Sequence, residues 1–165
     1  MTIVREPTIR CSAKALVLDG EKLLLNSHLD STGSVYYDLP GGGQHPLETM
    51  EEAVVREVLE ETGLTVEPVR FAALAEEIFT NSDMLARYPQ YCHRVMHIFL
   101  VRVIPGTPQA KAEMDFQQTG SVWVRPEEAE EMPLVPLQLR GRVRETLAAR
   151  SPVYLGSLRR SEVCM

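Results

Sequence analysis

One stretch of the chain decides the fold, and its residues 41–64 read GGGQHPLETMEEAVVREVLEETGL. Three consecutive glycines fit neither a helix nor a stable strand, so the stretch opens with a predicted loop whose backbone can approach a ligand closely. Apolar side chains then recur at helical spacing from Leu47 to Thr62. Pro46 suits the first turn of such a helix and Gly63 its C-terminal cap, so a glycine loop leading into a helix is predicted.

Three glutamates of this helix form its most informative pattern. Glu57, Glu60 and Glu61 stand at positions i, i+3 and i+4, and at about 100° per residue they share one face. Like charges at this spacing repel one another, and a bound cation relieves the repulsion. Ligation by carboxylates alone selects hard ions, which indicates Mg²⁺, with Mn²⁺ as a substitute. The alternative is a solvated acidic face, but the adjoining glycines favour a site that holds a phosphate or a metal.

The composition restricts the class of protein. The 165 residues carry 17 basic and 23 acidic side chains, a net charge of −6, with 44% hydrophobic and 24% charged residues. This composition is typical of one globular domain rather than of a disordered chain. A net acidic chain is a poor general nucleic-acid binder, although it can hold a small anionic substrate through metal ions.

The distribution of apolar residues and cysteines bears on location. No apolar run is long enough to span a membrane, and the first ten residues lack the hydrophobic region of a signal peptide. Three distant cysteines, Cys11, Cys92 and Cys164, argue against a disulfide framework. We therefore expect a cytoplasmic protein without a membrane partner.

The remaining elements follow from hydrophobic patterning. Extended segments are predicted for residues 9–18 and 22–29, which form a hairpin, and for residues 36–40, 64–80, 94–104 and 121–125. The segment 94–104 is apolar on both faces, which predicts a central strand. A helical turn from Pro126 and a helix over 137–149 are predicted, with loops over 81–90 and 105–116. We expect one domain over 1–165, with a core over about 9–149 and a loosely held tail over about 151–165.

The central stretch follows a recognisable pattern. From Gly42 it reads G-x5-E-x7-R-E-U-x-E-E-x-G-U, where U is a bulky aliphatic residue and Val58 and Leu64 fill the two U positions. This pattern resembles the Nudix box of the Nudix hydrolases, and the order of the flanking strands extends the resemblance over residues 9–149. The resemblance implies an α/β/α sandwich with a mixed sheet, in which the box forms a loop, a helix and a loop.

The resemblance also implies an activity and roles for individual residues. Its members hydrolyse a nucleoside diphosphate linked to another moiety, such as a nucleoside triphosphate, ADP-ribose or another nucleotide sugar. The implied metal ligands are Glu57, Glu60, Glu61 and the carbonyl of Gly41, and Glu48 and Arg56 are implied to orient the helix and its ligands. Gly41, Gly42 and Gly43 are expected to contact the metal or phosphate. The expected partner is a small nucleotide-type substrate, and a homodimer is left open.

A general base is expected outside the box. Many members of the family supply a further carboxylate from a loop before the last strand, and here Glu113 and Asp115 stand in that loop. We favour Glu113 because its longer side chain reaches further. Glu76 and Glu77, on the strand after the box, are weaker candidates. A carboxylate in this position would accept the proton of the attacking water.

Other side chains have both a structural and a functional interpretation. Four tyrosines could stack on a base or serve packing alone: Tyr36, Tyr37, Tyr88 and Tyr91. His93 and His97 share one face of a strand, where packing is the simpler interpretation. A non-catalytic module that senses nucleotides is the alternative function, but such a module would be expected to lose a ligand glutamate, and this chain keeps all three.

Overall fold

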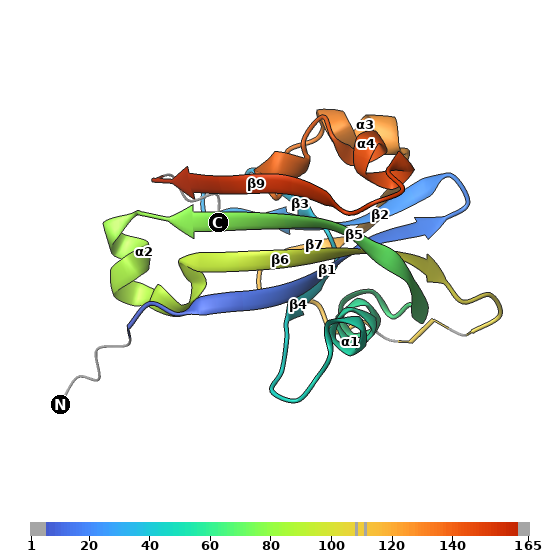
Figure 1. Cartoon of the computed structure of the whole chain (residues 1–165), viewed down its shortest axis with the longest axis horizontal. Helices are drawn as coiled ribbons and strands as arrows, with labels where there is room; N and C mark the ends of the chain where they lie inside the picture. The colour runs from blue at the N-terminus through green and yellow to red at the C-terminus, as the bar shows by residue number, and fades with distance from the viewer. Residues whose placement is uncertain (1–5, 108, 111, 162–165) are drawn as a thin grey trace.

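The computed structural model describes residues 6–107, 109–110 and 112–161. Within them, a nine-stranded mixed sheet forms the centre of the fold (Figure 1). Its strands are β1 (Ile9–Asp19), β2 (Lys22–Leu29), β3 (Val35–Asp38), β4 (Gly41–Gly43), β5 (Val66–Phe79), β6 (His93–Val103), β7 (Gln118–Val124), β8 (Leu134–Val135) and β9 (Val153–Arg160). The order is β8-β3-β2-β1-β6-β5-β9, with β4 paired to β1 and β7 to β2.

The sheet combines both strand directions and has helices on both faces. β1 and β6 run parallel, whereas β1 and β2 form the predicted antiparallel hairpin. Helix α1 (Met50–Thr62) covers one face, and α3 (Pro126–Glu131) and α4 (Val143–Ala148) lie over the other (Figure 1). The predicted sandwich is confirmed, and β6 lies in its middle because Ile98 packs into one core cluster and Phe99 into the other.

Helix α1 begins later than the sequence predicts. Thr49 is its N-cap: its hydroxyl accepts a hydrogen bond from the Glu52 amide at 3.1 Å, and the Glu52 carboxylate accepts one from the Thr49 amide at 2.8 Å. This reciprocal capping box fixes the first turn. Pro46 and Leu47 therefore precede the helix rather than open it. Gly63 ends the helix as predicted, with a left-handed φ of 73°.

The three glycines form a short strand, so the prediction of a loop is wrong. β4 pairs antiparallel with β1, placing Gly42 opposite Ala13 and Gly43 opposite Ser12. The approach is so close that a Cβ on Gly41 would lie 2.8 Å from the Cα of Lys14. The absence of side chains, which argues against a strand in general, is what permits this pairing.

Three further predictions need correction. Residues 81–90 are not a plain loop: Asn81 caps helix α2 (Ser82–Arg87), and the 3₁₀ turn η1 (Pro89–Tyr91) follows. The helix predicted over 137–149 is split into the 3₁₀ turn η2 (Leu137–Leu139) and α4. The supposed tail contains β9, which pairs in parallel with β5 at the sheet edge. No helix in the described residues is long and apolar enough to cross a membrane.

Candidate active site

Arg56 connects the acidic residues of the central stretch. Its Nε and Nη2 atoms donate to the two carboxylate oxygens of Glu48 at 2.7 and 2.9 Å. Its Nη1 atom donates to Glu57 at 2.7 Å and to Glu60 at 3.3 Å, and Nη2 also donates to the carbonyl of Gly43 at 3.0 Å. One guanidinium therefore ties three carboxylates to the glycine strand.

The pair formed by Glu48 and Arg56 fixes how α1 meets the segment before it. The hydrogen bonds from Arg56, and a further one from the His45 amide at 2.9 Å, lower the pKa of Glu48 to about 2. The same carboxylate raises the pKa of Arg56 above its ordinary value. Both groups stay charged at neutral pH, which supports the expected orienting role of this pair.

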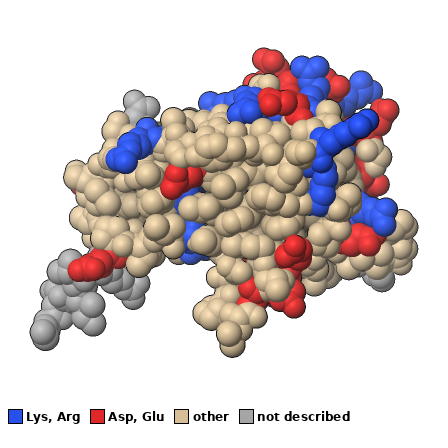
Figure 2. All heavy atoms as spheres, viewed as in Figure 1, with Lys and Arg blue, Asp and Glu red and all other residues tan. Residues whose placement is uncertain are grey.

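Glu57 lies directly against Gly42. A Cβ on Gly42 would lie 2.6 Å from the carboxyl carbon of Glu57 and 2.7 Å from its Oε1 atom. Only glycine leaves this space, so the sequence of β4 determines where the first acidic residue of the helix is held. The acidic side chains over α1 form the red patch in the lower part of Figure 2.

Glu61 has a different environment from the other two glutamates. Its side chain is buried, and one carboxylate oxygen accepts hydrogen bonds from Nδ2 of Asn26 at 2.7 Å and from the Gly41 amide at 2.9 Å. Burial raises the pKa of Glu61 to about 8, and the nearby charge of Asp38 acts in the same direction, although Lys14 opposes it. The carboxyl group is thus held at the junction of α1, β2 and β4.

A polar cluster beside Glu61 was not singled out from the sequence. Lys14 donates to Asp38 at 3.3 Å, to the carbonyl of Leu39 at 3.1 Å and to the carbonyl of Gly41. His28 lies 2.9 Å from the other oxygen of Asp38. Burial acts to lower the pKa of Lys14, but the charges of Asp38 and Glu61 outweigh it and raise that pKa. In the sequence, the signal that could have indicated this cluster is the lysine within the largely apolar strand β1.

The loop between β6 and β7 is attached to the end of α1. The amide of Glu113 donates to the carbonyl of Glu60 at 2.6 Å, and the side chain of Gln118 donates to the carbonyl of Glu61 at 3.2 Å. Asp115 is exposed, and its negative charge contributes to the raised pKa of Glu61. Asp115 also lines a cavity of about 280 Å³ with His28 and Asp38.

The weaker base candidates have structural partners. Hydrogen bonds from the hydroxyl of Ser157 and from His93, whose Nε2 atom lies 2.7 Å from Glu76, lower the pKa of Glu76. Glu77 is fully buried and pairs with Arg94 and, at 3.6 Å, with Arg160 of β9. These contacts join β5 to its neighbours.

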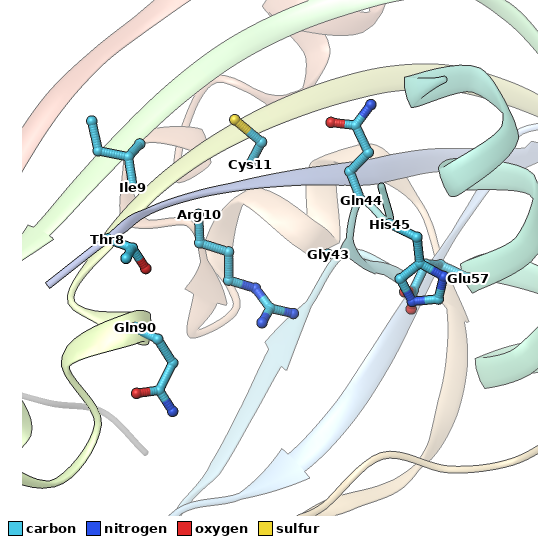
Figure 3. A pocket seen from close by; sticks show the side chains of 9 residues that line it. All are labelled: Thr8, Ile9, Arg10, Cys11, Gly43, Gln44, His45, Glu57 and Gln90. Carbon is cyan, nitrogen blue, oxygen red and sulfur yellow. The ribbon is translucent and has the colours of Figure 1, made fainter. Parts of the chain in front are cut away.

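Of the remaining candidate side chains, some pack against neighbours and others line cavities. His97 packs against Phe71. Tyr37 packs against a core cluster, whereas Tyr36 stacks on His28 with ring centroids 5.0 Å apart. Tyr88 and Tyr91 line an open cavity of about 410 Å³ together with Phe116 and Gln117. A third cavity, of about 450 Å³, adjoins β4 and includes Glu57 (Figure 3).

The donor set fits a hard divalent cation. Glu57, Glu60 and Glu61 supply only carboxylate oxygens, and the cradle at Gly42 leaves Glu57 beside the strand that carries the expected carbonyl ligand. In the part of the chain that the structure describes, no three side chains of His, Cys, Asp or Glu are arranged so that they could hold a metal ion together. Arg56 holds Glu57 and Glu60, while Glu61 turns toward Asn26.

Comparison with known proteins identifies the family. The model of the NUDIX domain matches residues 9–147, and the chain belongs to this family of hydrolases. The NAD-capped RNA hydrolase NudC of Pasteurella multocida is 38% identical over 72 residues, which are 44% of this chain and 27% of that protein. The chain thus matches only about a quarter of the length of this curated relative.

Solved structures show the same fold. A NUDIX hydrolase from Nitrosomonas europaea is similar with a TM-score of 0.63 and 20% identity, covering 85% of this chain and 88% of that one. An ADP-ribose pyrophosphatase from Streptococcus suis is similar with a TM-score of 0.58 and 20% identity, covering 92% of this chain and all of that one. At these identities the likeness concerns the fold.

Proposed function

We propose that this chain is a metal-dependent hydrolase that cleaves the diphosphate linkage of a nucleoside diphosphate derivative. The observation that carries the proposal is the contact between Glu57 and Gly42, which sets a carboxylate against the glycine strand. The names of two similar proteins, an NAD-capped RNA hydrolase and an ADP-ribose pyrophosphatase, support a nucleotide-type substrate.

In this proposal the box glutamates hold Mg²⁺ or Mn²⁺. Glu57, Glu60 and Glu61 would bind the cation, with a carbonyl oxygen of β4 beside them. When bound, the cation would neutralise the diphosphate and make a coordinated water a competent nucleophile near neutral pH. The carbonyl of Gly41 already accepts from Lys14, so it would have to share its second lone pair with the cation.

The remaining roles fall to groups around the helix. Arg56 and Glu48 would keep α1 at a fixed angle to β4, which positions the carboxylates before substrate arrives. A carboxylate of the loop after β6 would accept the proton of the attacking water, and the place of Asp115 in the lining of the cavity with His28 and Asp38 favours Asp115 over Glu113. The cavity of Tyr88, Tyr91 and Phe116 would accept a planar ring such as a nucleobase.

The test is hydrolysis of a panel of phosphoanhydrides with and without Mg²⁺. The panel contains nucleoside triphosphates, ADP-ribose, other nucleotide sugars, dinucleoside polyphosphates and NAD-capped RNA. Glu60→Gln and Glu61→Gln keep the side-chain size and remove a carboxylate that can ligate the cation, so we expect a rate loss of at least about 100-fold with the fold retained. Glu51→Gln, an exposed residue in the first turn of α1, is the matched control. Mg²⁺-dependent turnover at the wild-type rate by both variants would refute the proposal.

A further inference from the structure

Arg10 of β1 reaches the same cavity as Glu57. The cavity of about 450 Å³ is lined by Arg10, Gly43 and Glu57, together with residues of the segment after β4 and with Gln90 of η1. In Figure 3 the guanidinium of Arg10 points from β1 into this space, toward Gly43, while Glu57 lies beyond His45. A cationic side chain and a box carboxylate thus border one opening.

Two neighbours hold the guanidinium in place. Its central carbon lies 4.9 Å from the centre of the Tyr91 ring, which is within the range of a cation–π contact. A Cβ on Gly43 would lie 2.6 Å from one terminal nitrogen of Arg10, so the guanidinium also rests against the backbone of β4. Neither neighbour is an acceptor for its N–H groups, and these groups are the part of a guanidinium that binds phosphate oxygens in pairs.

Arg10 differs from Arg56 in its partners. In the described segments of the chain, no carboxylate forms an ion pair with Arg10 and no acceptor forms a hydrogen bond with it, whereas Arg56 pairs with Glu48, Glu57 and Glu60. The acidic residues of the box therefore have a partner of their own. A positive charge remains at the cavity, where an anion carried by the substrate can bind it.

We propose that Arg10 binds a non-bridging phosphate oxygen of the substrate, on the side of the diphosphate away from the box glutamates, and that Tyr91 positions it. The proposal rests on the proposed function, because it places the same diphosphate between Arg10 and Glu57. It adds a substrate-binding residue outside the box. It also requires a substrate whose second phosphate extends from α1 toward η1.

Steady-state kinetics on the best substrate of the panel test this role. Arg10→Ala should raise KM by roughly 10- to 100-fold, the range expected for losing charged hydrogen bonds, with kcat changed by less than about threefold. The KM of Arg10→Lys should lie between those of the wild type and Arg10→Ala, because lysine keeps the charge and loses the paired donors. The matched control is Arg102→Ala, which removes an exposed arginine of β6 that pairs with Glu67. An unchanged KM in Arg10→Ala would overturn the proposal.

A binding measurement separates this proposal from the activity itself. Methylenediphosphonate, a non-hydrolysable diphosphate, is titrated into each variant by calorimetry, in Mg²⁺ and again in EDTA. We expect Arg10→Ala to weaken binding in both buffers, whereas Tyr91→Phe keeps the ring and should bind like the wild type, and Tyr91→Leu should bind more weakly. Equal affinities for wild type and Arg10→Ala would overturn the proposal.

The two proposals fail in different ways. A wild-type protein that hydrolyses no member of the panel refutes the proposed hydrolase, yet a loss of methylenediphosphonate binding in Arg10→Ala would still support the phosphate-binding role. A wild-type protein that hydrolyses its substrate while Arg10→Ala shows wild-type KM and affinity refutes the role of Arg10 alone. The melting temperature of each variant verifies that it is folded, and Arg10→Lys provides a second, milder substitution.

Discussion

The carboxylate of Glu57 occupies the space in which a side chain on Gly42 would begin. One residue belongs to a strand and the other to the helix that follows, and they are fifteen positions apart in the sequence. The position of Glu57 therefore depends on the absence of a Cβ in β4 as much as on the geometry of α1. This dependence can be tested without changing a charge.

We expect Gly42→Ala to impair hydrolysis while retaining the fold. The new methyl group would contact the Glu57 carboxyl group at less than the separation that real Cβ atoms show, so the carboxylate must move away from β4. A ligand displaced by about 1 Å can lower the rate by about 100-fold. The measurements are kcat and the concentration of Mg²⁺ that gives half-maximal rate.

Gly43→Ala provides a contrast for this experiment. A methyl group on Gly43 meets the guanidinium of Arg10 instead of Glu57. We expect it to raise KM for substrate and to leave the Mg²⁺ requirement nearly unchanged. Identical effects of the two substitutions would mean that the whole of β4 is disturbed and that the contact between Gly42 and Glu57 has no separate role.

A second prediction concerns metal and stability. Glu57, Glu60 and Glu61 are the expected ligands of the cation, and a cation that binds only the folded state should stabilise it. Millimolar Mg²⁺ or Mn²⁺ should raise the melting temperature by roughly 3–8 °C at saturating occupancy. Glu57→Gln should abolish most of this shift, and Glu51→Gln should keep it. A wild-type melting curve that does not respond to either metal would contradict the ligand assignment.

The helix of the central stretch could be predicted from the sequence. The spacing of its glutamates and the position of Arg56 were evident there, and in the structure Arg56 donates to Glu48. The start of the helix was placed too early because Pro46 suits a first turn, although Thr49 and Glu52 carry the T-x-x-E pattern of a capping box, which marks the true start. Local pattern thus predicted the helix and the spacing of its glutamates but not its first residue.

Contacts between distant segments could not be predicted from local sequence patterns. Lys14 looks like an ordinary strand residue, and its interactions with Asp38 and with Gly41 arise only when β1, β3 and β4 come together. The residues of β9 were predicted to lie in a loosely held tail. The strand is held by pairing with β5 and by the contact of Arg160 with the buried Glu77, neither of which leaves a periodic signal.

A third prediction concerns pH and stability at the pair of helices over the other face. Glu130 of α3 accepts hydrogen bonds from the backbone amide of Arg144 at 2.8 Å and from its Nε atom at 3.0 Å. The bonds from Arg144 lower the pKa of Glu130. A carboxylate with a lowered pKa stabilises the fold above its unfolded pKa, near 4.5, and this contribution disappears as pH falls through the folded value.

Glu130→Gln should therefore destabilise the protein at pH 7 by up to about 1 kcal/mol, and the difference from wild type should shrink below about pH 4.5. Glu131→Gln removes an exposed charge from the same helix and serves as the control. Urea denaturation at several pH values measures both. A difference between wild type and Glu130→Gln that is constant from pH 7 to pH 3.5 would show that this charge does not stabilise the contact of α3 with α4.

The last prediction decides which acid of the loop accepts the proton of the attacking water. From the sequence, Glu113 was favoured because its side chain is longer. In the structure the backbone amide of Glu113 contacts α1, whereas the side chain of Asp115 lines the cavity of His28 and Asp38 and its charge contributes to the raised pKa of Glu61. We expect Asp115→Asn to lower kcat by roughly 10- to 1,000-fold and to remove the acidic limb of the pH–rate profile, because losing a general base has effects of this order.

Glu113→Gln, the matched control, should change kcat by less than about threefold. Equal Mg²⁺ affinity in both variants, measured by titration, would show that the loop acts on proton transfer rather than on the metal. Should Glu113→Gln be the inactive variant, the base is Glu113 and the loop must rearrange when substrate binds; if both variants keep the wild-type rate, neither loop acid is the base and it lies among the box glutamates.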